Sequence, residues 1–294
     1  ALKNVSFDVE KGEFISIIGP SGSGKSTLLR SINKMIDISK GSILFENRNI
    51  EKLKKKEIEL VRREIGMIFQ NPLDSLNPVF KVGNQVQEAI MLDKVNKVDA
   101  WNRVIDLFKQ VKMPDAEERA NSFPHELSGG MRQRVMIAMM LSRNPELLIA
   151  DEPTTALDVT IEAQILDILK HLKNNYNTAI MLITHNFGLV AEIADKIGVM
   201  YAGEIIEMGD VYEIFKNPIH PYTKLLMQAL PRITKNRGRL TTIEGSVPRI
   251  TEKKEECRFA NRCPYSTDRC RNQEPPLVVL ENGHSYRCFE LKEV

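Results

Sequence analysis

Cysteine is absent from the first 256 residues of this 294-residue chain, and all four cysteines lie between 257 and 288. Long hydrophobic runs are missing too: stretches such as AIMLI at 179–183 fall far short of the roughly 18 residues that span a bilayer. No secretory signal is evident either. We therefore expect a cytoplasmic protein, a setting in which thiols stay reduced and structural disulfides are rare.

The chain also lacks an excess of either charge, since 41 Lys and Arg residues stand against 39 Asp and Glu residues. This balance gives no reason to expect bulk nucleic-acid binding. Hydrophobic residues make up 42% and charged residues 27%, as in ordinary globular proteins. The length suits one large domain and a small one. Because the sequence begins at Ala1 and not at Met, we expect the natural N-terminus to lie upstream.

The order of the predicted elements indicates an α/β fold. Two short strands around a turn are predicted at 3–10 and 14–19, and a glycine loop and a helix at 26–35 follow them. Such a strand, loop and helix open a parallel α/β sheet. Further strands are predicted at 147–151 and 179–184, with a helix at 161–172 between them.

Two segments depart from this core. Residues of about 81–145 predict a helical insertion that includes an amphipathic helix at 98–113. From Pro218 onward, prolines and charges increase, periodicity fades and the cysteines appear. We therefore predict two domains: a first domain at 1–215, with a core of about 1–80 and 146–215, and a C-terminal extension at 216–294.

GPSGSGKST at 19–27 matches the pattern G-x-x-x-x-G-K-[ST] of a phosphate-binding loop. Its glycines let the backbone N–H groups point inward, and the following helix offers its positive end to an anion. Lys25 is expected to reach the β- and γ-phosphates, Ser26 to hold Mg²⁺, and Thr27 to add a donor. With a strand before it and a helix after it, the loop predicts a nucleoside triphosphate site.

LLIADEP at 147–153 places two carboxylates at the end of an apolar strand. Alone, such a pair is as compatible with two solvated acids as with a site. Beside the phosphate loop, Asp151 is the expected partner of Mg²⁺ and Glu152 the expected general base for the attacking water.

Two further strand ends bring polar residues toward the same crevice, because parallel strands open their C-terminal ends on one side of a sheet. His185 follows the strand at 179–184 and is expected near Glu152 and the γ-phosphate. Gln70 ends GMIFQ and is expected to contact Mg²⁺ and to orient water. A lone histidine at such a place is more often structural than catalytic.

LSGGMRQRVMIAMML at 127–141 predicts a Ser-capped helix whose N-terminus could hold a second anion. A plain N-capped core helix explains the pattern equally well. Since the chain already has one phosphate loop, a second anion site makes sense if it closes over a nucleotide held by a partner.

In this order, the motifs resemble the ATP-binding cassette of ABC transporters: the Walker A loop, the Q-loop glutamine, the signature LSGGMRQ, the Walker B strand with Glu152, the D-loop ALD at 156–158 and the switch His185. The resemblance spans nearly all of 1–215. It implies a P-loop NTPase nucleotide-binding domain with a helical insertion, and two cassettes that pair head to tail. Ser128 and Gly130 would then contact the partner's ATP. The complete set of residues expected to bind ATP and Mg²⁺ is Gly19, Ser21, Gly22, Ser23, Gly24, Lys25, Ser26, Thr27, Gln70, Asp151, Ser128 and Gly130.

Segments at 69–85, 150–166 and 217–231, together with the cysteine tail, resemble the ATPases of bacterial oligopeptide/dipeptide importers. The signature helix and VMYAGEIIE are more similar to the first of the two paired ATPases, the D-type. This resemblance implies a second ATPase subunit, two membrane permeases and an extracytoplasmic binding protein, with this chain on the cytoplasmic face of the membrane. In this family, an aromatic residue upstream of the Walker A loop stacks on adenine, and we expect it to lie before Ala1 in the natural chain.

Other functions stay open at this point. Nickel or another small solute could be the cargo of a related importer. A soluble ABC ATPase of translation or DNA maintenance is a rival, although the chain shows neither sustained heptads nor a second cassette. A third hypothesis is an iron–sulfur redox module attached to an ATPase.

The cysteines are spaced C-x5-C-x6-C-x17-C, without the paired C-x-x-C motifs of zinc ribbons. Four thiolates suit either Zn²⁺ or a [4Fe–4S] cluster, and four unrelated thiols fit the spacing as well. The resemblance implies a [4Fe–4S] cluster on Cys257, Cys263, Cys270 and Cys288, with Zn²⁺ as the alternative. His284 could replace a ligand, but we expect it to be a surface residue of the turn ENGH.

Overall fold

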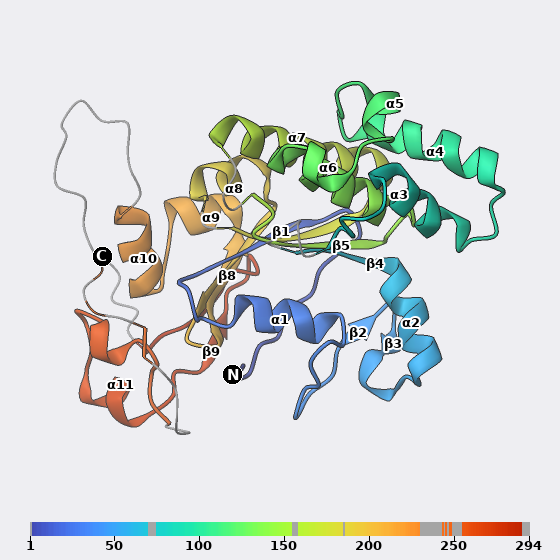
Figure 1. Cartoon of the computed structure of the whole chain (residues 1–294). Coiled ribbons are helices and arrows are strands. Elements are labelled where there is room, and N and C mark those ends of the chain that lie inside the picture. The colour runs from blue at the N-terminus through green and yellow to red at the C-terminus, as the bar shows by residue number, and fades with distance from the viewer. Residues whose placement is uncertain are drawn as a thin grey trace, which may run out of the picture. The chain divides into compact units, whose positions relative to one another are not determined.

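The computed structural model describes residues 2–69, 75–154, 158–184, 186–229, 243, 245, 247–248 and 255–289. The chain folds as two compact units (Figure 1). The first unit comprises Ala1–Asp8, Ile15–Leu28 and His185–Val294, and the second comprises Val9–Phe14 and Leu29–Thr184. The predicted division at residue 215 stays a prediction.

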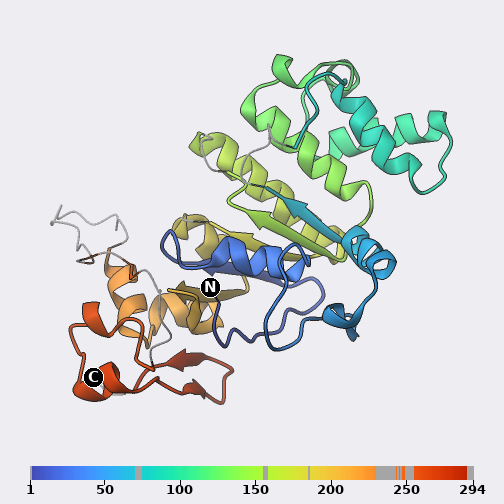
Figure 2. The same cartoon turned by 60° about the horizontal axis from the view of Figure 1, so that its bottom comes forward.

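The first unit is built on five strands in the order β1-β7-β8-β10-β9. β1 (Phe14–Ile18) and β7 (Lys196–Tyr201) pair in parallel, with Ile15 opposite Lys196, and the remaining pairs are antiparallel. The continuous burial of β1 fits its mainly apolar sequence FISII, in which Ser16 is buried as well. The C-terminal hairpin of β9 (Leu277–Val279) and β10 (Ser285–Arg287) joins the sheet beside β8 (Glu204–Asp210); Figure 2 shows it as two red arrows.

Short helices complete the first unit: α8 (Phe187–Ile193), α9 (Val211–Lys216), α10 (Pro221–Gln228), a 3₁₀ turn (Ala260–Arg262) and α11 (Asp268–Asn272). The rings of Tyr201, Tyr222 and Phe259 form a tight cluster, with centroids 4.9–5.3 Å apart. Edge-to-face and tilted ring pairs of this kind add stability beyond the burial of their area. The cluster therefore fastens the cysteine-containing segment to β7 and α10.

The second unit contains the parallel strands β4 (Ile65–Ile68), β5 (Leu147–Asp151) and β6 (Ala179–Ile183), with α7 (Val159–Tyr176) packed on β6. It also holds β2 (Leu44–Phe45), β3 (Arg48–Asn49), a 3₁₀ turn (Ile50–Lys52) and α2 (Lys55–Glu64). Asp158 caps α7 by accepting the Ile161 N–H at 2.9 Å.

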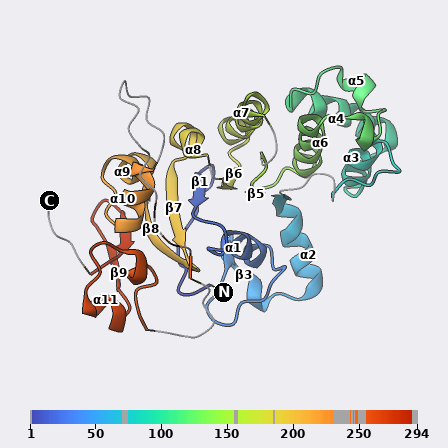
Figure 3. The same ribbon diagram turned by 60° about the vertical axis from the view of Figure 1, so that its left-hand side comes forward.

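Four helices of the second unit pack as a group, as Figure 3 shows: α3 (Val82–Met91), α4 (Lys97–Gln110), α5 (Ala116–Arg119) and α6 (Gly129–Leu141), with a 3₁₀ turn at Pro124–Glu126 before α6. Asn96 caps α4 with two hydrogen bonds, and Val104 and Phe108 are completely buried. The apolar period at 98–113 therefore predicted a real helix face.

The structure confirms some of the predicted strands and helices and contradicts one of them. The strands at 147–151 and 179–184 and the helix after the glycine loop, α1 (Lys25–Ile32), are confirmed. The strand predicted at 3–10 is wrong, because those residues form no regular element. No helix in the described part of the chain is both long and apolar enough to cross a membrane.

Candidate functional site

The phosphate loop of the first unit begins where β1 ends. Gly19 has a φ of +154°, and a Cβ there would lie 2.1 Å from the Met200 carbonyl oxygen. Gly24 has a φ of +102°, and its Cβ would lie 2.9 Å from Leu2. Space for a side chain is lacking at Gly19, where the neighbour is backbone, and the positive φ angle favours glycine at both positions. The conformation of the loop therefore explains why the motif has glycine at these two positions.

Lys25 begins α1 and is 6% exposed. Its Nζ donates hydrogen bonds to the carbonyl oxygens of Gly19, at 2.8 Å, and Pro20, at 3.1 Å. The ammonium thus closes over the loop, where the backbone N–H groups at the start of a helix favour an anion. Phosphate oxygens at this place would be stronger, charged acceptors than the two carbonyls.

Ser23 adds a second feature that suits an anion. Its hydroxyl oxygen is buried and has no hydrogen-bond partner among the described residues. Its carbonyl oxygen accepts the Gly203 N–H at 2.7 Å, and the Gly203 carbonyl accepts the Lys3 N–H at 2.9 Å. A buried hydroxyl without a partner is costly, and a phosphate oxygen could satisfy it.

In the second unit, β5 delivers the predicted acids. Asp151 ends the strand and is 7% exposed. Glu152 follows with a φ of +47°, and its N–H donates to the Ile183 carbonyl oxygen at 3.0 Å. A positive φ is uncommon for glutamate, and such conformations gather at functional sites. Asp151 thus ends the strand in an extended conformation, whereas Glu152 directly after it has a positive φ.

The start of α6 was predicted either as a plain N-capped helix or as a second anion site. Ser128 is exposed and caps the helix by accepting the Met131 N–H at 3.3 Å. Gly130 is buried, and a Cβ there would lie 2.6 Å from the Ile161 side chain of α7. The packing of α6 against α7 thus explains why a glycine occurs at this position, independently of any contact with a nucleotide. The N-capped helix and the second anion site both remain compatible with this geometry.

The remaining predicted residues are placed only in part. Gln70 and His185 lie outside the described residues. Ser21 and Gly22 lie in the loop before α1, and Ser26 and Thr27 lie in the first turn of that helix. The joint Mg²⁺ site of Ser26, Gln70 and Asp151 stays a prediction, as do the roles of Lys25, Glu152 and His185.

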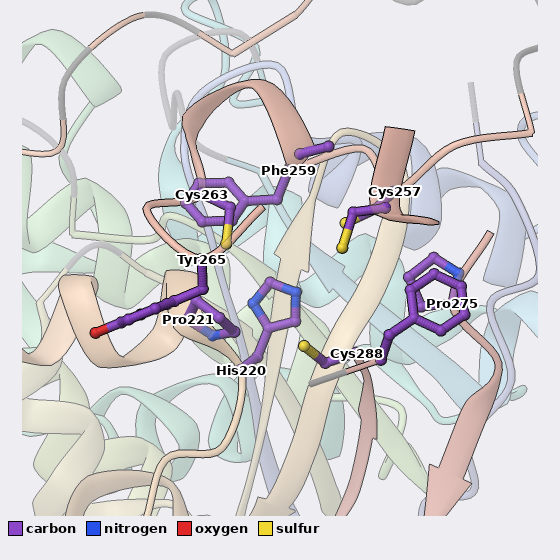
Figure 4. A pocket seen from close by; sticks show the side chains of 11 residues that line it. His220, Pro221, Cys257, Phe259, Cys263, Tyr265, Pro275 and Cys288 are labelled. Carbon is purple, nitrogen blue, oxygen red and sulfur yellow. The ribbon is translucent and has the colours of Figure 1, made fainter. Parts of the chain in front are cut away.

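All four cysteines line one pocket of the first unit, which we call the thiol pocket, together with the rings of Phe259 and His220 (Figure 4). The backbone holds two of them together, since the Cys257 N–H donates to the Cys270 carbonyl oxygen at 2.8 Å. Burial raises the pKa of the Cys257 thiol to about 12. No disulfide joins the four described thiols, and they belong to the same compact unit as the phosphate loop. A separate cysteine-rich extension is therefore not shown.

The predicted metal centre is not shown either. Within the described ranges, no three or more His, Cys, Asp or Glu side chains are grouped closely enough to hold a metal ion. The structure does bring the four thiols to one pocket. The spacing of the cysteines in the sequence did not predict this convergence, and only the family resemblance implied it.

His284 corrects another expectation. It is 2% exposed, so its prediction as a surface residue is wrong. Its Nε2 lies 2.8 Å from Oε1 of Glu207, a completely buried carboxylate. The imidazole is therefore hydrogen-bonded to this carboxylate and not to the cysteines. Because this ring bonds a carboxylate and does not line the thiol pocket, it is no replacement ligand.

Glu207 and His220 are the functional candidates that the sequence did not reveal. Glu207 Oε1 accepts the Ile219 N–H at 2.6 Å, and Oε2 accepts the His220 N–H at 2.9 Å. Burial lowers the pKa of His220 to about 4, so the ring is neutral at pH 7. The only available sign was the pair His220-Pro221, which suits the start of a helix but does not indicate burial beside cysteines.

The family model "ABC transporter" matches residues 2–155, and the model "Oligopeptide/dipeptide transporter, C-terminal region" matches residues 206–270. The chain is 46% identical over 294 residues to the dipeptide transport ATP-binding protein DppD of Escherichia coli K12, covering 98% of this chain and 90% of that one. It is 47% identical over 299 residues to the oligopeptide transport ATP-binding protein OppD of Bacillus subtilis 168, covering 99% and 84%.

Solved structures agree. The ATP-binding cassette MJ0796, in a dimeric post-hydrolysis state bound to ADP and Pi, superposes with a TM-score of 0.66 at 31% identity over 71% of this chain and 90% of that one. The protein cbiO1 of Clostridium perfringens, part of the ABC transporter complex cbiONQ, gives 0.68 at 32% over 74% and 84%. These likenesses confirm the α/β fold of an ATP-binding cassette. The chain belongs to the ABC transporter family, among the peptide-transport ATP-binding proteins.

Proposed function

We propose that this chain is the ATP-hydrolysing subunit that powers a membrane importer of dipeptides or oligopeptides. The similarity to peptide-transport ATP-binding proteins over 98% of the chain carries this proposal. The tight phosphate loop, with its buried ammonium and hydroxyl, supplies the matching chemistry. Neither the nickel importer nor the soluble ABC ATPase gains support from the two relatives named above, since both names refer to peptide transport.

In this mechanism, the Lys25 ammonium exchanges the carbonyls of Gly19 and Pro20 for the β- and γ-phosphate oxygens of ATP. Glu152 takes a proton from the attacking water, and His185 helps to position the reacting groups. Asp151, buried at its strand end, offers oxygen ligands that suit a hard cation. Mg²⁺ would be held by Asp151 with the Ser26 hydroxyl and the Gln70 amide, and it would neutralise charge on the phosphates.

The working assembly pairs this chain head to tail with a second ATPase subunit, or with its own copy when isolated. Ser128 and Gly130 at the start of α6 then face the nucleotide held by the partner, where the helix N-terminus favours phosphate. ATP bound across both halves favours the closed pair, and hydrolysis releases it. Two permeases, fed by an extracytoplasmic binding protein, would receive this motion at the cytoplasmic face of the membrane.

Deletion of this subunit from its own cell tests the proposal. We expect uptake of a labelled dipeptide to stop, to return with the wild-type chain, and to stay absent with Glu152→Gln. Uptake of nickel is measured in the same cells and should not change. Loss of nickel uptake with normal dipeptide uptake would assign the chain to the other cargo.

We infer further that the thiol pocket holds a [4Fe–4S] cluster on Cys257, Cys263, Cys270 and Cys288. Four thiols that converge on an apolar pocket of one unit form the complete donor set of such a cluster. A single Zn²⁺, with Zn–S distances of about 2.3 Å, needs its sulfurs roughly 4 Å apart, and no such close group occurs among the described residues. A cluster holds each thiolate on a different iron, so its ligands lie farther apart.

The cluster would cross-link four positions within the segment at 257–288, or would serve as a one-electron redox centre. Anaerobic purification followed by absorption spectroscopy and analysis of iron, sulfide and zinc tests it. We expect about four irons per chain, with loss of iron in Cys270→Ser and retention in Ser285→Ala, a change in the nearby hairpin. A colourless protein with one zinc and no iron would contradict the cluster.

A further inference from the structure

His220 places a fully buried imidazole against the thiol pocket. The residue is 1% exposed, lines the pocket and lies beside the Phe259 ring, with centroids 5.8 Å apart. Figure 4 shows its ring reaching up from the chain among the side chains of Cys257, Cys263 and Cys288. Burial of a polar ring costs free energy unless its nitrogens form hydrogen bonds, so each ring nitrogen is expected to have a partner.

The hydrogen bond at the start of α10 determines which nitrogen of this ring carries the proton. The Tyr222 N–H donates to Nδ1 of His220 at 3.0 Å, as in an N-cap. An accepting nitrogen has no proton, so the proton of the neutral ring sits on Nε2. The helix cap thus leaves Nε2–H as the group that the ring can offer.

The ring is also fixed in place. Glu207 holds the backbone on the N-terminal side of the ring through the Ile219 and His220 N–H groups, and His284 occupies the same carboxylate. Tyr222 holds Nδ1 from the other side. With both ends held, the imidazole cannot turn its other nitrogen toward the pocket without breaking the cap.

This arrangement argues against His220 as a metal ligand. A ligating Nε2 would need a lone pair, and Nδ1 already uses its own to accept from Tyr222. Such a ring would have to lose both protons, whereas a ligating histidine ordinarily donates from its other nitrogen. Among the residues that the structure describes, none forms a hydrogen bond with Nε2 of His220. A donor to sulfur therefore fits the ring better than a ligand.

We propose that His220 donates its Nε2–H to a sulfur of the cluster held by the thiol pocket, and so sets the cluster's reduction potential. This inference rests on the cluster proposed above. Hydrogen bonds to the sulfurs of iron–sulfur clusters tune their potential. Because reduction adds one negative charge, a donor stabilises the reduced form more and raises the potential. His220 is thus a positioning and tuning residue, not one of the ligands.

Two substitutions separate the cap from the donor. His220→Asn keeps an acceptor for the Tyr222 N–H, since Asn is a favoured N-cap, but lacks a donor at the ε position. His220→Gln places an amide N–H near that position and should restore part of the effect. His284→Asn is the matched control, because it makes the same change in the other buried histidine on Glu207, which does not line the pocket.

The experiment is an anaerobic redox titration of the purified protein, with dithionite as the one-electron reductant and iron content measured in each sample. His220→Asn should shift the ratio of oxidised to reduced cluster about tenfold at a given potential, which is about 59 mV downward for a one-electron couple. His284→Asn should match the wild type. A fully loaded His220→Asn protein with the wild-type potential overturns the inference.

A second measurement needs no variant and keeps the inference testable if His220→Asn loses its iron. The reduced wild-type protein is labelled with ¹⁵N in its histidine rings and studied by electron–nuclear double resonance in H₂O and D₂O. We expect an exchangeable proton and a ring ¹⁵N coupled to the cluster. A loaded cluster without these couplings overturns the role of His220 alone, whereas a wild-type protein without iron overturns the cluster itself.

Discussion

The phosphate loop and the thiol pocket belong to the same compact unit, yet they are built in opposite ways. The loop occupies nine successive residues, 19–27, and presents mainly backbone groups at the start of one helix. The pocket is lined by residues spread from His220 to Phe289, and their spacing follows no period or short motif. A site made of backbone depends on glycine conformation, while a site made of side chains depends on what packs behind them.

This difference determines what holds each site. At the loop, the constraint is local: Gly19 is pressed against the Met200 carbonyl, and Lys25 closes over the loop's own carbonyls. At the pocket, the constraint is distant: the aromatic cluster and the buried Glu207 fasten the segment to the sheet. We therefore expect substitutions at the loop to change nucleotide binding, and substitutions behind the pocket to change the stability of the cysteine-containing segment. Each kind of substitution should have little effect on the other property.

Glu152→Gln should have the largest effect. If the carboxylate is the general base, its loss lowers turnover about 10²- to 10⁴-fold, because the amide cannot take up a proton. Nucleotide binding and iron content should stay unchanged. Phosphate release at saturating ATP measures the change, and Glu146→Gln, just before the opposite end of β5, is the matched control. Wild-type turnover in Glu152→Gln would remove this residue from the chemistry.

Lys25→Met comes next. It keeps the aliphatic stem but removes the ammonium that the structure places over the loop. A lost charge-assisted hydrogen bond of about 1.5–3 kcal/mol corresponds to roughly 10- to 100-fold weaker ATP binding. Equilibrium binding of a fluorescent ATP analogue measures it, with Lys11→Met, on an exposed side chain, as control. Unaltered affinity would contradict the phosphate-loop assignment.

The two sites also differ in how far the sequence predicted them. The position of the loop between a strand and a helix could be predicted because its motif is contiguous and its glycines have a positive φ. The strands that end at Asp151 and at 183 were predictable because buried parallel strands are unbroken apolar runs. The prediction of a strand at 3–10 failed because the local sequence alone does not supply a pairing partner.

The pocket could not be predicted because it depends on contacts between residues that are far apart in the sequence. Glu207 lies in a strand whose sequence gives no sign that its carboxylate is buried, and His284 follows a turn that looks solvent-exposed. Their burial arises from the pairing of β8 with β10, a contact across more than seventy residues. Only the family resemblance tied the cysteines to one another before the structure brought them to one pocket.

Glu207→Gln tests the distant constraint. An amide can accept from one of the Ile219 and His220 N–H groups but turns its own N–H toward the other. Leaving one buried donor unsatisfied costs about 1–3 kcal/mol. Hydrogen exchange at these two amides should quicken accordingly, while ATP affinity stays at the wild-type value. Glu213→Gln, on the exposed side chain that bonds Asn217, is the control. Unchanged exchange would mean that packing, not this carboxylate, holds the segment.

Arg258→Met tests a link that would join the two sites, and its expected effect is the smallest. Arg258 follows Cys257, donates to the Ala202 carbonyl oxygen and lies 3.1 Å from Oε1 of Glu204, a carboxyl whose pKa burial raises. The same turn donates the Gly203 N–H to the phosphate loop at Ser23. One arginine therefore reaches from the thiol segment to the back of the loop.

Without the guanidinium, the turn is held less firmly and the loop is less well prepared for phosphate. Because this effect on the loop is indirect, we expect ATP affinity to fall only about two- to fivefold, which corresponds to about 0.5–1 kcal/mol of binding free energy. Arg269→Met, which removes a guanidinium stacked on Phe289 in the same segment, should leave affinity unchanged. Affinity in Arg258→Met equal to that of the wild type would make the two sites independent neighbours, each held by its own constraint.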